Sequence, residues 1–384
     1  MAKTMRTILI LMIIGLGIGV FFALRPRQQK GSPEKLRAAS VLILEGPLKS
    51  YGEQVRTGIN LALEDIHQQE GEDLEVTFKS FDGDPLRAED EVRTAVLRDQ
   101  QGFVIEVFGT SAALQVSDFV NQNHVVTVSG VDTGYLLTKK MGKYFFRIIP
   151  SDQESVKALL KWAKDLHADK VTVIAVTTDW GKGVADMVEE SSHDFQLKVT
   201  RMEVDKSQTL FEPIVSRLKS RKDSTVILAV NPDQAGNFVR ATQKFDFHPN
   251  ILGTDNLTAG EFTSTAGDTA VGIRYVLPPT PKKNDIRNTV IAKLRSRLGL
   301  AATEDPHPFA LYGYDETWLV YRAMKAAHGD PDKAVSFLES YKGVGATGPL
   351  QFDKQHDVVL SGNYRRMSFR RDATAKVVAD EVTQ

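Results

Sequence analysis

Small polar residues collect in this sequence where an apolar run ends and a helical pattern begins. Gly109, Thr110 and Ser111 follow the mostly apolar run 104–108, and the turn 129–133 (SGVDT) follows the run 125–128. A third turn, 179–183 (DWGKG), follows the run 171–176. A helix that starts in such a turn presents free backbone N–H groups, and a nearby hydroxyl adds a donor. These turns therefore suit an anion or another small polar group.

Four residues that could contact a ligand, Ser111, Thr133, Trp180 and Asp255, could instead have a purely structural role. The hydroxyl of Ser111 can cap the helix that follows it, and the hydroxyl of Thr133 can bond within its own turn. Asp255, in the segment GTD, can close an Asx turn, and Trp180 can pack at an edge. Residue type and spacing leave both roles open.

The motifs of common enzyme classes are absent from the sequence. There is no G-x-S-x-G, no H-E-x-x-H, no phosphate loop ending in G-K-[ST], and no G-x-G-x-x-G after a strand. The eight histidines are scattered, and the chain has no cysteine, so thiolate zinc sites and cysteine nucleophiles are excluded. We predict a protein that is not an enzyme and that uses no metal or cofactor.

The distribution of charge argues against nucleic-acid binding. Residues 1–37 hold seven of the 48 Lys and Arg residues and one of the 49 Asp and Glu residues. The remaining chain therefore has 41 basic and 48 acidic residues, a net charge of about −7. An acidic body with no basic stripe does not suit a polyanion.

Strand and helix patterns alternate through most of the chain, which is typical of parallel sheets covered by helices on both faces. Two such runs, divided near Pro150, predict an α/β protein with two doubly wound lobes. The predicted strands are 41–45, 74–81, 104–108, 125–129, 171–176, 198–204, 225–230 and 271–277. The predicted helices are 52–67, 85–99, 112–121, 153–165, 182–191, 210–219, 234–244, 285–298 and 309–327.

Residues 8–24 form an uncharged, mostly apolar run that would be about 25 Å long as a helix, at the short end of a membrane span. Lys3 and Arg6 precede it, as in a secretory signal, but no small-x-small cleavage site follows. We predict an export signal that stays as an anchor (1–24) or is cut, and a polar linker (25–38). Taken alone, the positive-inside rule would favour a cytoplasmic body, because more basic residues follow the run than precede it.

Short motifs in a fixed order carry a resemblance to a known family. They span about 40–369 and include the following: Gly46-Pro47, Tyr51-Gly52-Glu53, Asp82-x-Asp84-Pro85, Gly109-Thr110-Ser111, Tyr144-Phe145-Phe146-Arg147, Asp179-x-Gly181-x-Gly183, Tyr312-x-x-Asp315 and Thr347-Gly348-Pro349. In this order and spacing, the chain resembles the leucine/isoleucine/valine-binding proteins, the type I periplasmic solute-binding proteins of ABC importers.

The resemblance implies two lobes, joined by a three-strand hinge, that close over a small solute. Lobe 1 would comprise 39–149 and 277–352, and lobe 2 would comprise 150–276 and 353–384. Ser111 resembles the hydroxyl that receives a ligand carboxylate, and Asp255 stands where an acid receives the ligand ammonium. The other expected ligand-binding residues are Val131, Asp132, Thr133, Trp180 and Asn231.

Three of these residues depart from the family pattern. Asp132 stands where a small residue is usual, and its carboxylate would repel a ligand carboxylate unless it points away or pairs with a cation. Trp180 replaces the more common Tyr, and Asn231 stands where some members have a second aromatic residue. These departures leave the ligand open between a small amino acid, an amide, a polyamine-like cation and another small polar solute.

The resemblance places the body of the protein on the periplasmic or extracellular side, anchored to the inner membrane by residues 8–24 or secreted. The expected partners are a small-molecule ligand and an ABC permease. The alternative is a membrane-tethered sensor of the same fold that acts on a membrane signalling protein.

Overall fold

The computed structural model of this chain describes residues 36–46, 48–281, 284–302 and 304–382. The predicted hydrophobic helix at 8–24 and most of the predicted linker lie outside the described residues. Within the described part of the chain, no helix has the length and apolar character needed to cross a membrane.

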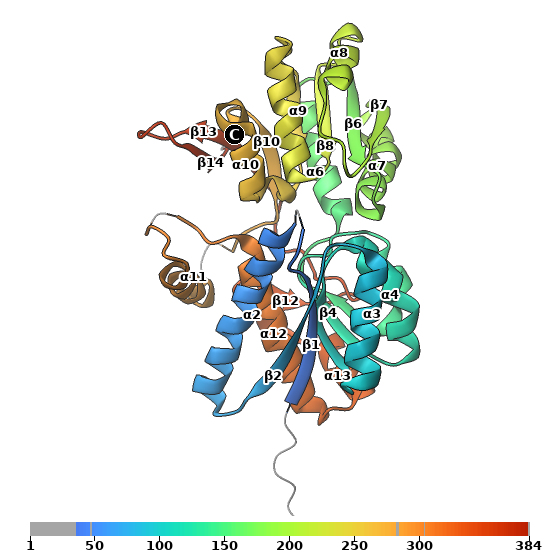
Figure 1. The fold of residues 1–384 in the computed structure, drawn as a ribbon, viewed down its shortest axis with the longest axis vertical. Coiled ribbons are helices and arrows are strands. Elements are labelled where there is room, and N and C mark those ends of the chain that lie inside the picture. The colour runs from blue at the N-terminus through green and yellow to red at the C-terminus, as the bar shows by residue number, and fades with distance from the viewer. Residues whose placement is uncertain (1–35, 47, 282–283, 303, 383–384) are drawn as a thin grey trace, which may run out of the picture. The chain divides into compact units, whose positions relative to one another are not determined.

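The first sheet has five parallel strands in the order β2-β1-β3-β4-β5 (Figure 1). Its strands are β1 (Leu36–Ile43), β2 (Leu74–Phe81), β3 (Phe103–Val107), β4 (Val126–Ser129) and β5 (Phe145–Arg147). The helices packed with it are α2 (Lys49–Glu70), α3 (Pro85–Arg93), α4 (Thr110–Gln122), α5 (Leu137–Met141), α11 (Asp285–Leu298), α12 (Pro308–Ala327) and α13 (Pro331–Glu339). We call this part lobe 1.

The second sheet has seven strands in the order β14-β13-β10-β9-β8-β6-β7. Its strands are β6 (Lys170–Val176), β7 (Lys198–Val204), β8 (Thr225–Ala229), β9 (Asn250–Gly253), β10 (Arg274–Leu277), β13 (Arg365–Arg371) and β14 (Val377–Glu381). Its helices are α6 (Asp152–Asp165), α7 (Asp179–Ser191), α8 (Glu212–Ser220), α9 (Pro232–Lys244) and α10 (Gly260–Ala266). We call this part lobe 2. A small ribbon, β11 (Lys342–Val344) with β12 (Pro349–Gln351), completes the strands of the described residues.

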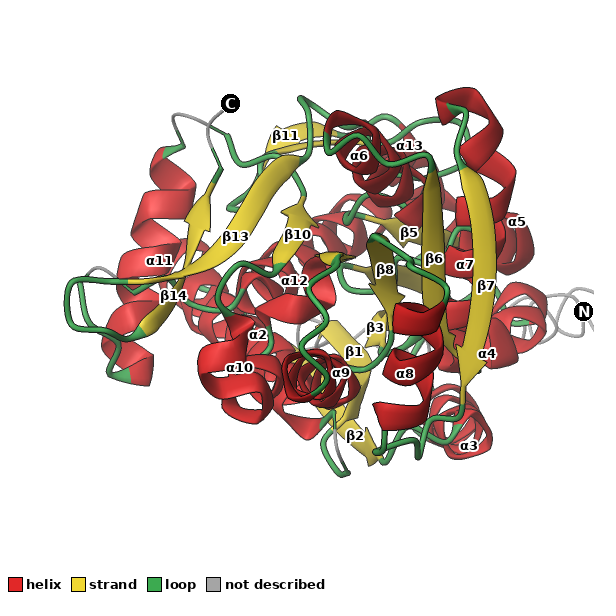
Figure 2. Ribbon diagram, turned by 90° about the horizontal axis from the view of Figure 1, so that it is seen from above, coloured by secondary structure: helices red, strands yellow, loops and turns green. Residues whose placement is uncertain are grey.

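The prediction of parallel sheets is confirmed for lobe 1 and for β6 to β10 of lobe 2. The last two strands differ, because β13 pairs antiparallel with β10 and β14 pairs antiparallel with β13. Figure 2 shows this pair on the side of the sheet away from β7. A two-strand ribbon joined by a short turn can only be antiparallel, and the alternation of strands with helices that predicts parallel pairing stops before it.

Burial explains why the strands form where they do. All five residues of β3 and all five of β8 are buried, as expected for strands covered by helices on both faces. Lobe 1 has one apolar core, and lobe 2 has one core on each face of its sheet. Strands β2 and β7 and helix α11 begin and end at the predicted residues.

Three segments connect the lobes. The first runs from β5 to α6, the second leaves β10 at Leu277, and the third lies between β12 and β13. Part of the third segment bonds to lobe 1, since His356 O accepts from Arg147 N at 2.9 Å and Arg147 O accepts from Val358 N at 2.8 Å. The predicted three-strand hinge corresponds to these three segments, and the residue limits of the lobes stay a prediction.

Helices α2 and α12 cross with their backbones in contact. A Cβ on Gly58 would lie 1.9 Å from the carbonyl oxygen of Ala310, and one on Gly313 would lie 2.4 Å from that of Val55. Such distances leave no room for a side chain at either position. The contact fixes the start of α12, which carries residues of the site described below.

We expect Gly58→Ala to lower the free energy of unfolding by about 1–3 kcal/mol, because the added methyl group must push the two helix backbones apart. Urea denaturation measures the change. Gly260→Ala is the matched control, since a Cβ at Gly260 would meet no atom within 4 Å. Equal urea midpoints for the two variants would contradict the close crossing.

Candidate functional site

A cavity of about 190 Å³ lies between the lobes. Its wall includes residues from the carboxyl ends of strands in both sheets, which is where ligands bind in open α/β folds. All seven predicted ligand-binding residues line it: Ser111, Val131, Asp132, Thr133, Trp180, Asn231 and Asp255. The structure thus brings together side chains that are up to 144 positions apart in the sequence. Their role toward a ligand stays a prediction.

The amino-terminal end of α4 forms one wall of the cavity. Gly109, with φ of 105°, is the residue before the helix, and it bears no side chain that could cap the first turn. The helix begins at Thr110, two residues earlier than predicted, so Ser111 lies in the first turn instead of capping it. Ser111 Oγ accepts from the backbone N–H of Asp179, across the cavity, at 3.3 Å. Helix N-terminal N–H groups beside hydroxyls favour an anionic group here.

Asp132 does not aim a free carboxylate at this helix end. Its Oδ1 accepts from Gly109 N at 2.6 Å, and its side chain is buried. Burial, with the negative charge of Glu106 as a second cause, raises the pKa of Asp132 well above its ordinary value. A neutral Asp132 carboxyl group does not repel an anion, so the departure from the family pattern is compatible with a ligand carboxylate nearby.

Glu106 is the partner that the sequence analysis missed. It lies in the middle of β3 with a left-handed φ of 66°. Its Oε2 accepts from Ser129 Oγ at 3.0 Å and from the backbone N–H groups of Gly130 and Val131 at 3.0 and 3.1 Å. Three donors stabilise a charged Glu106, whereas Asp132 receives one, so the proton belongs on Asp132. An acid inside an otherwise apolar strand (FVIEV) was the signal available.

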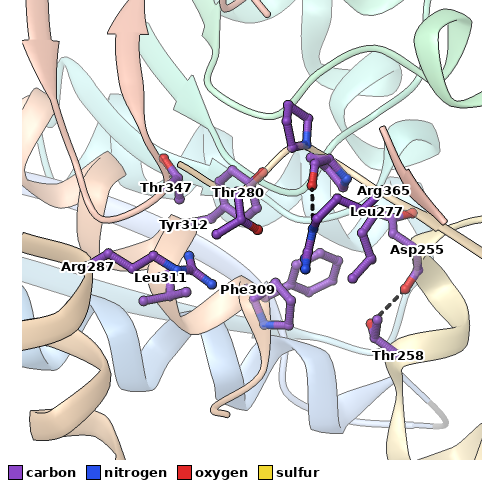
Figure 3. A pocket seen from close by; sticks show the side chains of 13 residues that line it. Asp255, Thr258, Leu277, Thr280, Arg287, Phe309, Leu311, Tyr312, Thr347 and Arg365 are labelled. Carbon is purple, nitrogen blue, oxygen red and sulfur yellow. Dashed lines mark hydrogen bonds between the residues drawn. The ribbon is translucent and has the colours of Figure 1, made fainter. Parts of the chain in front are cut away.

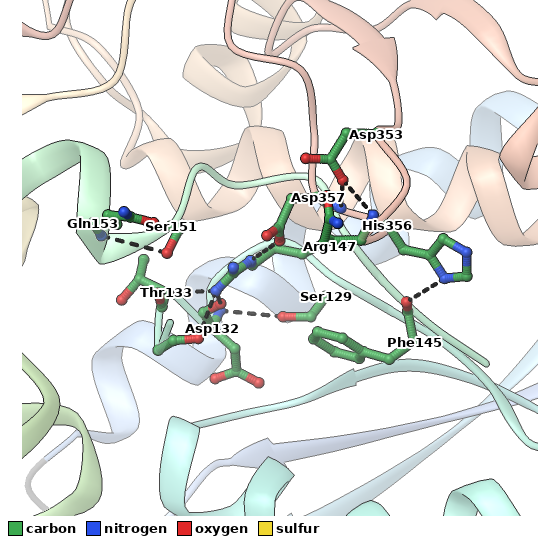
Figure 4. Close-up of polar contacts among 12 residues, drawn as sticks. Ser129, Asp132, Thr133, Phe145, Arg147, Ser151, Gln153, Asp353, His356 and Asp357 are labelled. Atoms are coloured by element: carbon green, nitrogen blue, oxygen red, sulfur yellow. Dashed lines mark hydrogen bonds and ion pairs between the residues drawn. The ribbon is translucent and has the colours of Figure 1, made fainter. Parts of the chain in front are cut away.

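Arg147 fixes the same turn from the other side (Figure 4). Its side chain is fully buried, and its Nη1 donates to the carbonyl oxygens of Thr133 and Gly134 at 2.9 and 2.7 Å. Its Nε donates to Asp357 Oδ1 at 2.6 Å, in the third connecting segment. One guanidinium group therefore holds the Val131–Thr133 turn against the hinge.

Lobe 2 contributes helix starts and a carboxyl group. Trp180 lies in the first turn of α7, and Asn231 directly precedes α9. Asp255 follows β9, and no basic nitrogen of the described residues lies within ion-pair distance of its carboxylate. Burial raises the pKa of Asp255 to about 6, against two backbone N–H groups that lower it. An acid without a basic partner on the cavity wall suits a ligand cation.

Asp152, the first residue of α6, lies beside the cavity wall, and the sequence analysis did not select it. Its backbone N–H donates to Thr133 O at 2.9 Å. Burial, and then repulsion from Asp255, raise the pKa of Asp152 to about 7. The Thr133 hydroxyl, the positive charge of Arg147 and the Trp180 ring, in that order, oppose the rise. Groups from both lobes therefore affect the pKa of Asp152.

Aromatic side chains form the apolar part of the wall. Tyr51, Phe108 and Phe309 line the cavity, and the ring centres of Tyr51 and Phe309 are 5.2 Å apart. Tyr51 Oη also donates to Asn256 O in lobe 2 at 2.6 Å. His307 approaches Thr258 Oγ1 of lobe 2 at 3.1 Å, and burial lowers the pKa of His307 to about 4, so its ring is neutral.

A family model described as periplasmic binding protein matches residues 35–372. The chain belongs to this family. Among curated relatives, a leucine-, isoleucine-, valine-, threonine- and alanine-binding protein of Pseudomonas aeruginosa is 24% identical over 336 residues, covering 86% of this chain and 88% of the relative. A Leu/Ile/Val-binding protein of Escherichia coli is 19% identical, and the match covers 85% of this chain and 88% of that protein.

Solved structures share the fold. The leucine-binding protein LivK from Thermotoga maritima has a TM-score of 0.82 at 19% identity, covering 91% of this chain and 98% of its own. A solute-binding protein from Rhodopseudomonas palustris, in complex with 3,4-dihydroxybenzoic acid, has a TM-score of 0.79 at 18% identity. The match covers 91% of this chain and 96% of that protein. This periplasmic binding protein therefore has the type I fold that its motifs predicted.

We expect Asp152→Asn to stabilise the protein more at pH 8 than at pH 5, by a difference on the order of 2 kcal/mol. The folded state binds the Asp152 proton more tightly than the unfolded chain does. Asp152 therefore weakens folding increasingly as pH rises from about 4 to 7, and the amide removes this loss. Urea denaturation at the two pH values measures the effect.

Asp194→Asn is the control, because Asp194 is exposed. If the gain from Asp152→Asn is the same at both pH values, the carboxyl group of Asp152 is not held protonated in the folded protein.

Proposed function

We propose that this chain is an extracytoplasmic solute-binding protein that captures a small amino acid, or a closely related amide, between its lobes and delivers it to an ABC importer. The observation that carries the proposal is the pairing of two opposite features in one cavity. The α4 helix start favours an anion, and the unpaired Asp255 favours a cation. An α-amino acid has both charges.

The apolar lining supports a ligand with a small hydrocarbon side chain. Tyr51, Phe309 and Trp180 provide aromatic surface, and a cavity of about 190 Å³ is small for anything much larger than a single amino acid. The relatives named as binding leucine, isoleucine, valine, threonine or alanine fit this ligand class.

An aromatic acid is the second ligand class to consider, since a solved structure of this fold holds 3,4-dihydroxybenzoic acid. Such a ligand has no cation for Asp255. Leaving that carboxyl group unpaired beneath a bound ligand would cost free energy, so the amino acid is favoured.

Delivery to an importer requires a location outside the cytoplasm. The family membership supports a periplasmic site, and the basic and apolar residues at 3–24 would act as the export signal. We keep retention of that segment as an anchor within the proposal. The alternative of a membrane-tethered sensor depended on the same segment, and no observation in the described residues favours it over transport.

We expect at least one neutral L-amino acid to raise the melting temperature of the purified protein, because a ligand that binds only the folded state stabilises it by mass action. A thermal-shift series of amino acids, their amides and benzoates tests this expectation. Stabilisation by benzoates alone would reject the amino-acid proposal in favour of the aromatic class.

We expect Asp255→Asn to weaken binding of the stabilising amino acid at least tenfold at pH 7.5, about 1.4 kcal/mol. In the unaltered protein the affinity should fall below pH 6, because Asp255 must be ionised to bind an ammonium group and protonation removes its charge. Isothermal titration calorimetry between pH 5 and 7.5 measures both effects.

Asp255→Asn should also lose the fall in affinity that the unaltered protein shows between pH 7.5 and 5. Asp194→Asn again serves as the control, with the affinity and pH dependence of the unaltered protein. An affinity of Asp255→Asn equal to that of the control would remove Asp255 from the site.

A further inference from the structure

A second, smaller cavity of about 40 Å³ adjoins the ligand cavity (Figure 3). The two cavities share Asp255 and Phe309 as wall residues. The smaller one is bounded by the second connecting segment at Pro278–Thr280 and by the start of α12. Arg365, at the end of the third connecting segment, also lines it. The cavity therefore lies where two of the three connections between the lobes meet.

Two guanidinium groups point into this cavity from opposite sides, Arg287 from α11 and Arg365 from β13 (Figure 3). Within the described residues, Arg287 has no carboxylate at ion-pair distance. Its Nη1 donates to Ala346 O at 3.3 Å, which is a long bond. Arg365 donates from Nε to Pro278 O at 3.4 Å and has Glu381 at 3.6 Å on its outer side.

The acids near Arg287 are already engaged. Asp315 accepts from the backbone N–H groups of Ala346 and Thr347 at 2.8 and 2.7 Å, and Asp305 pairs with Arg295 at 2.7 Å. Burial and the nearby positive charge of Arg365 lower the pKa of Arg287. Two like charges line one small cavity, with the Asp255 carboxyl group as the one acid among the lining residues.

Hydroxyl groups add donors to a lining that is otherwise largely apolar. Thr280 and Tyr312 line the same cavity as the two arginines. A cavity of about 40 Å³ has room for about three water molecules, which fits a halide or one carboxylate group but not a bulky anion. Arginine forks bind such groups strongly because their N–H donors match the geometry.

We propose that Arg287 and Arg365 form a binding site for one carboxylate-sized monoanion at the hinge. The anion would bridge α11 of lobe 1 and β13 of lobe 2, and so favour the arrangement of the lobes seen here. Two sources share this chemistry. One is a free halide or formate ion, and the other is a second carboxylate on the ligand in the adjoining cavity, which rests on the proposed function.

The first experiment uses the full chain in mild detergent, at constant ionic strength, with potassium gluconate replaced stepwise by chloride or formate. We expect a rise in melting temperature of about 2 °C, because only the small ions fit the cavity. Arg287→Gln and Arg365→Gln should each abolish the rise, and Arg240→Gln, an exposed arginine on α9, should keep it. In bromide-soaked crystals, an anomalous peak should lie between Arg287 and Arg365.

The second experiment tests the ligand as the source, in gluconate without small anions. L-glutamate and L-2-aminoadipate are compared with L-leucine by the melting temperature of the protein. If the ligand supplies the anion, a dicarboxylic amino acid gives the larger shift, and Arg287→Gln reduces that shift to the value for L-leucine.

The proposal is overturned if neither small anions nor a second carboxylate changes the melting temperature in an arginine-dependent way and bromide gives no peak. A variant that fails to fold leaves the other arginine variant and the bromide crystals to decide. Failure of the amino-acid series with a positive chloride result would reject the proposed ligand class while keeping this site.

Discussion

The site depends on one buried guanidinium group. Arg147 is fully buried, and it bonds at once to backbone carbonyls of the Thr133–Gly134 turn and to Asp357 of a connecting segment. A buried charge needs hydrogen-bond partners, and among the described residues Nε and Nη1 have them whereas Nη2 has none. Parting the turn from the segment would remove the partners that the cation does have. The cavity wall in lobe 1 is therefore set by the same contact that anchors part of the hinge.

The buried carboxyl groups of this part of lobe 1 outnumber the one positive charge of Arg147. Glu106, Asp132 and Glu316 are all buried, and burial raises the pKa of each. Glu106 binds three donors and keeps its charge most easily, whereas both carboxyl oxygens of Glu316 lack a partner. A neutral Glu316 packed against Gly130 acts as a polar part of the core. The charge that faces the ligand cavity is then left to Asp255.

Sequence patterns located the fold and much of the wall, for a definite reason. Parallel strands place their carboxyl ends on one edge of a sheet, so turns such as Gly109–Ser111 and Ser129–Thr133 must meet there. The same pattern indicated the turn 179–183 that contains Trp180, and the resemblance added Asn231 and Asp255, which follow strands of the second sheet. Nothing local in the sequence indicated Asp152 or the Arg287–Arg365 pair. The environment that makes these side chains notable consists of residues far apart in the sequence, which the connecting segments bring together. The antiparallel end of the second sheet was missed because it has no helix to mark it.

The contacts between the lobes indicate how closure is controlled. Within the described residues, hydrogen bonds between the lobes include Ser111 with Asp179, Tyr51 with Asn256, and Thr258 with His307. Each neutral bond of this kind adds only about 1 kcal/mol, and all three sets of groups can bond to water when the lobes part. Such contacts favour one relative orientation of the lobes, but they are too weak to hold the lobes together alone. Under the proposed function, the differential free energy for closure comes from a ligand that engages Asp255 and the helix starts at once, so closure depends on occupancy of the cavity.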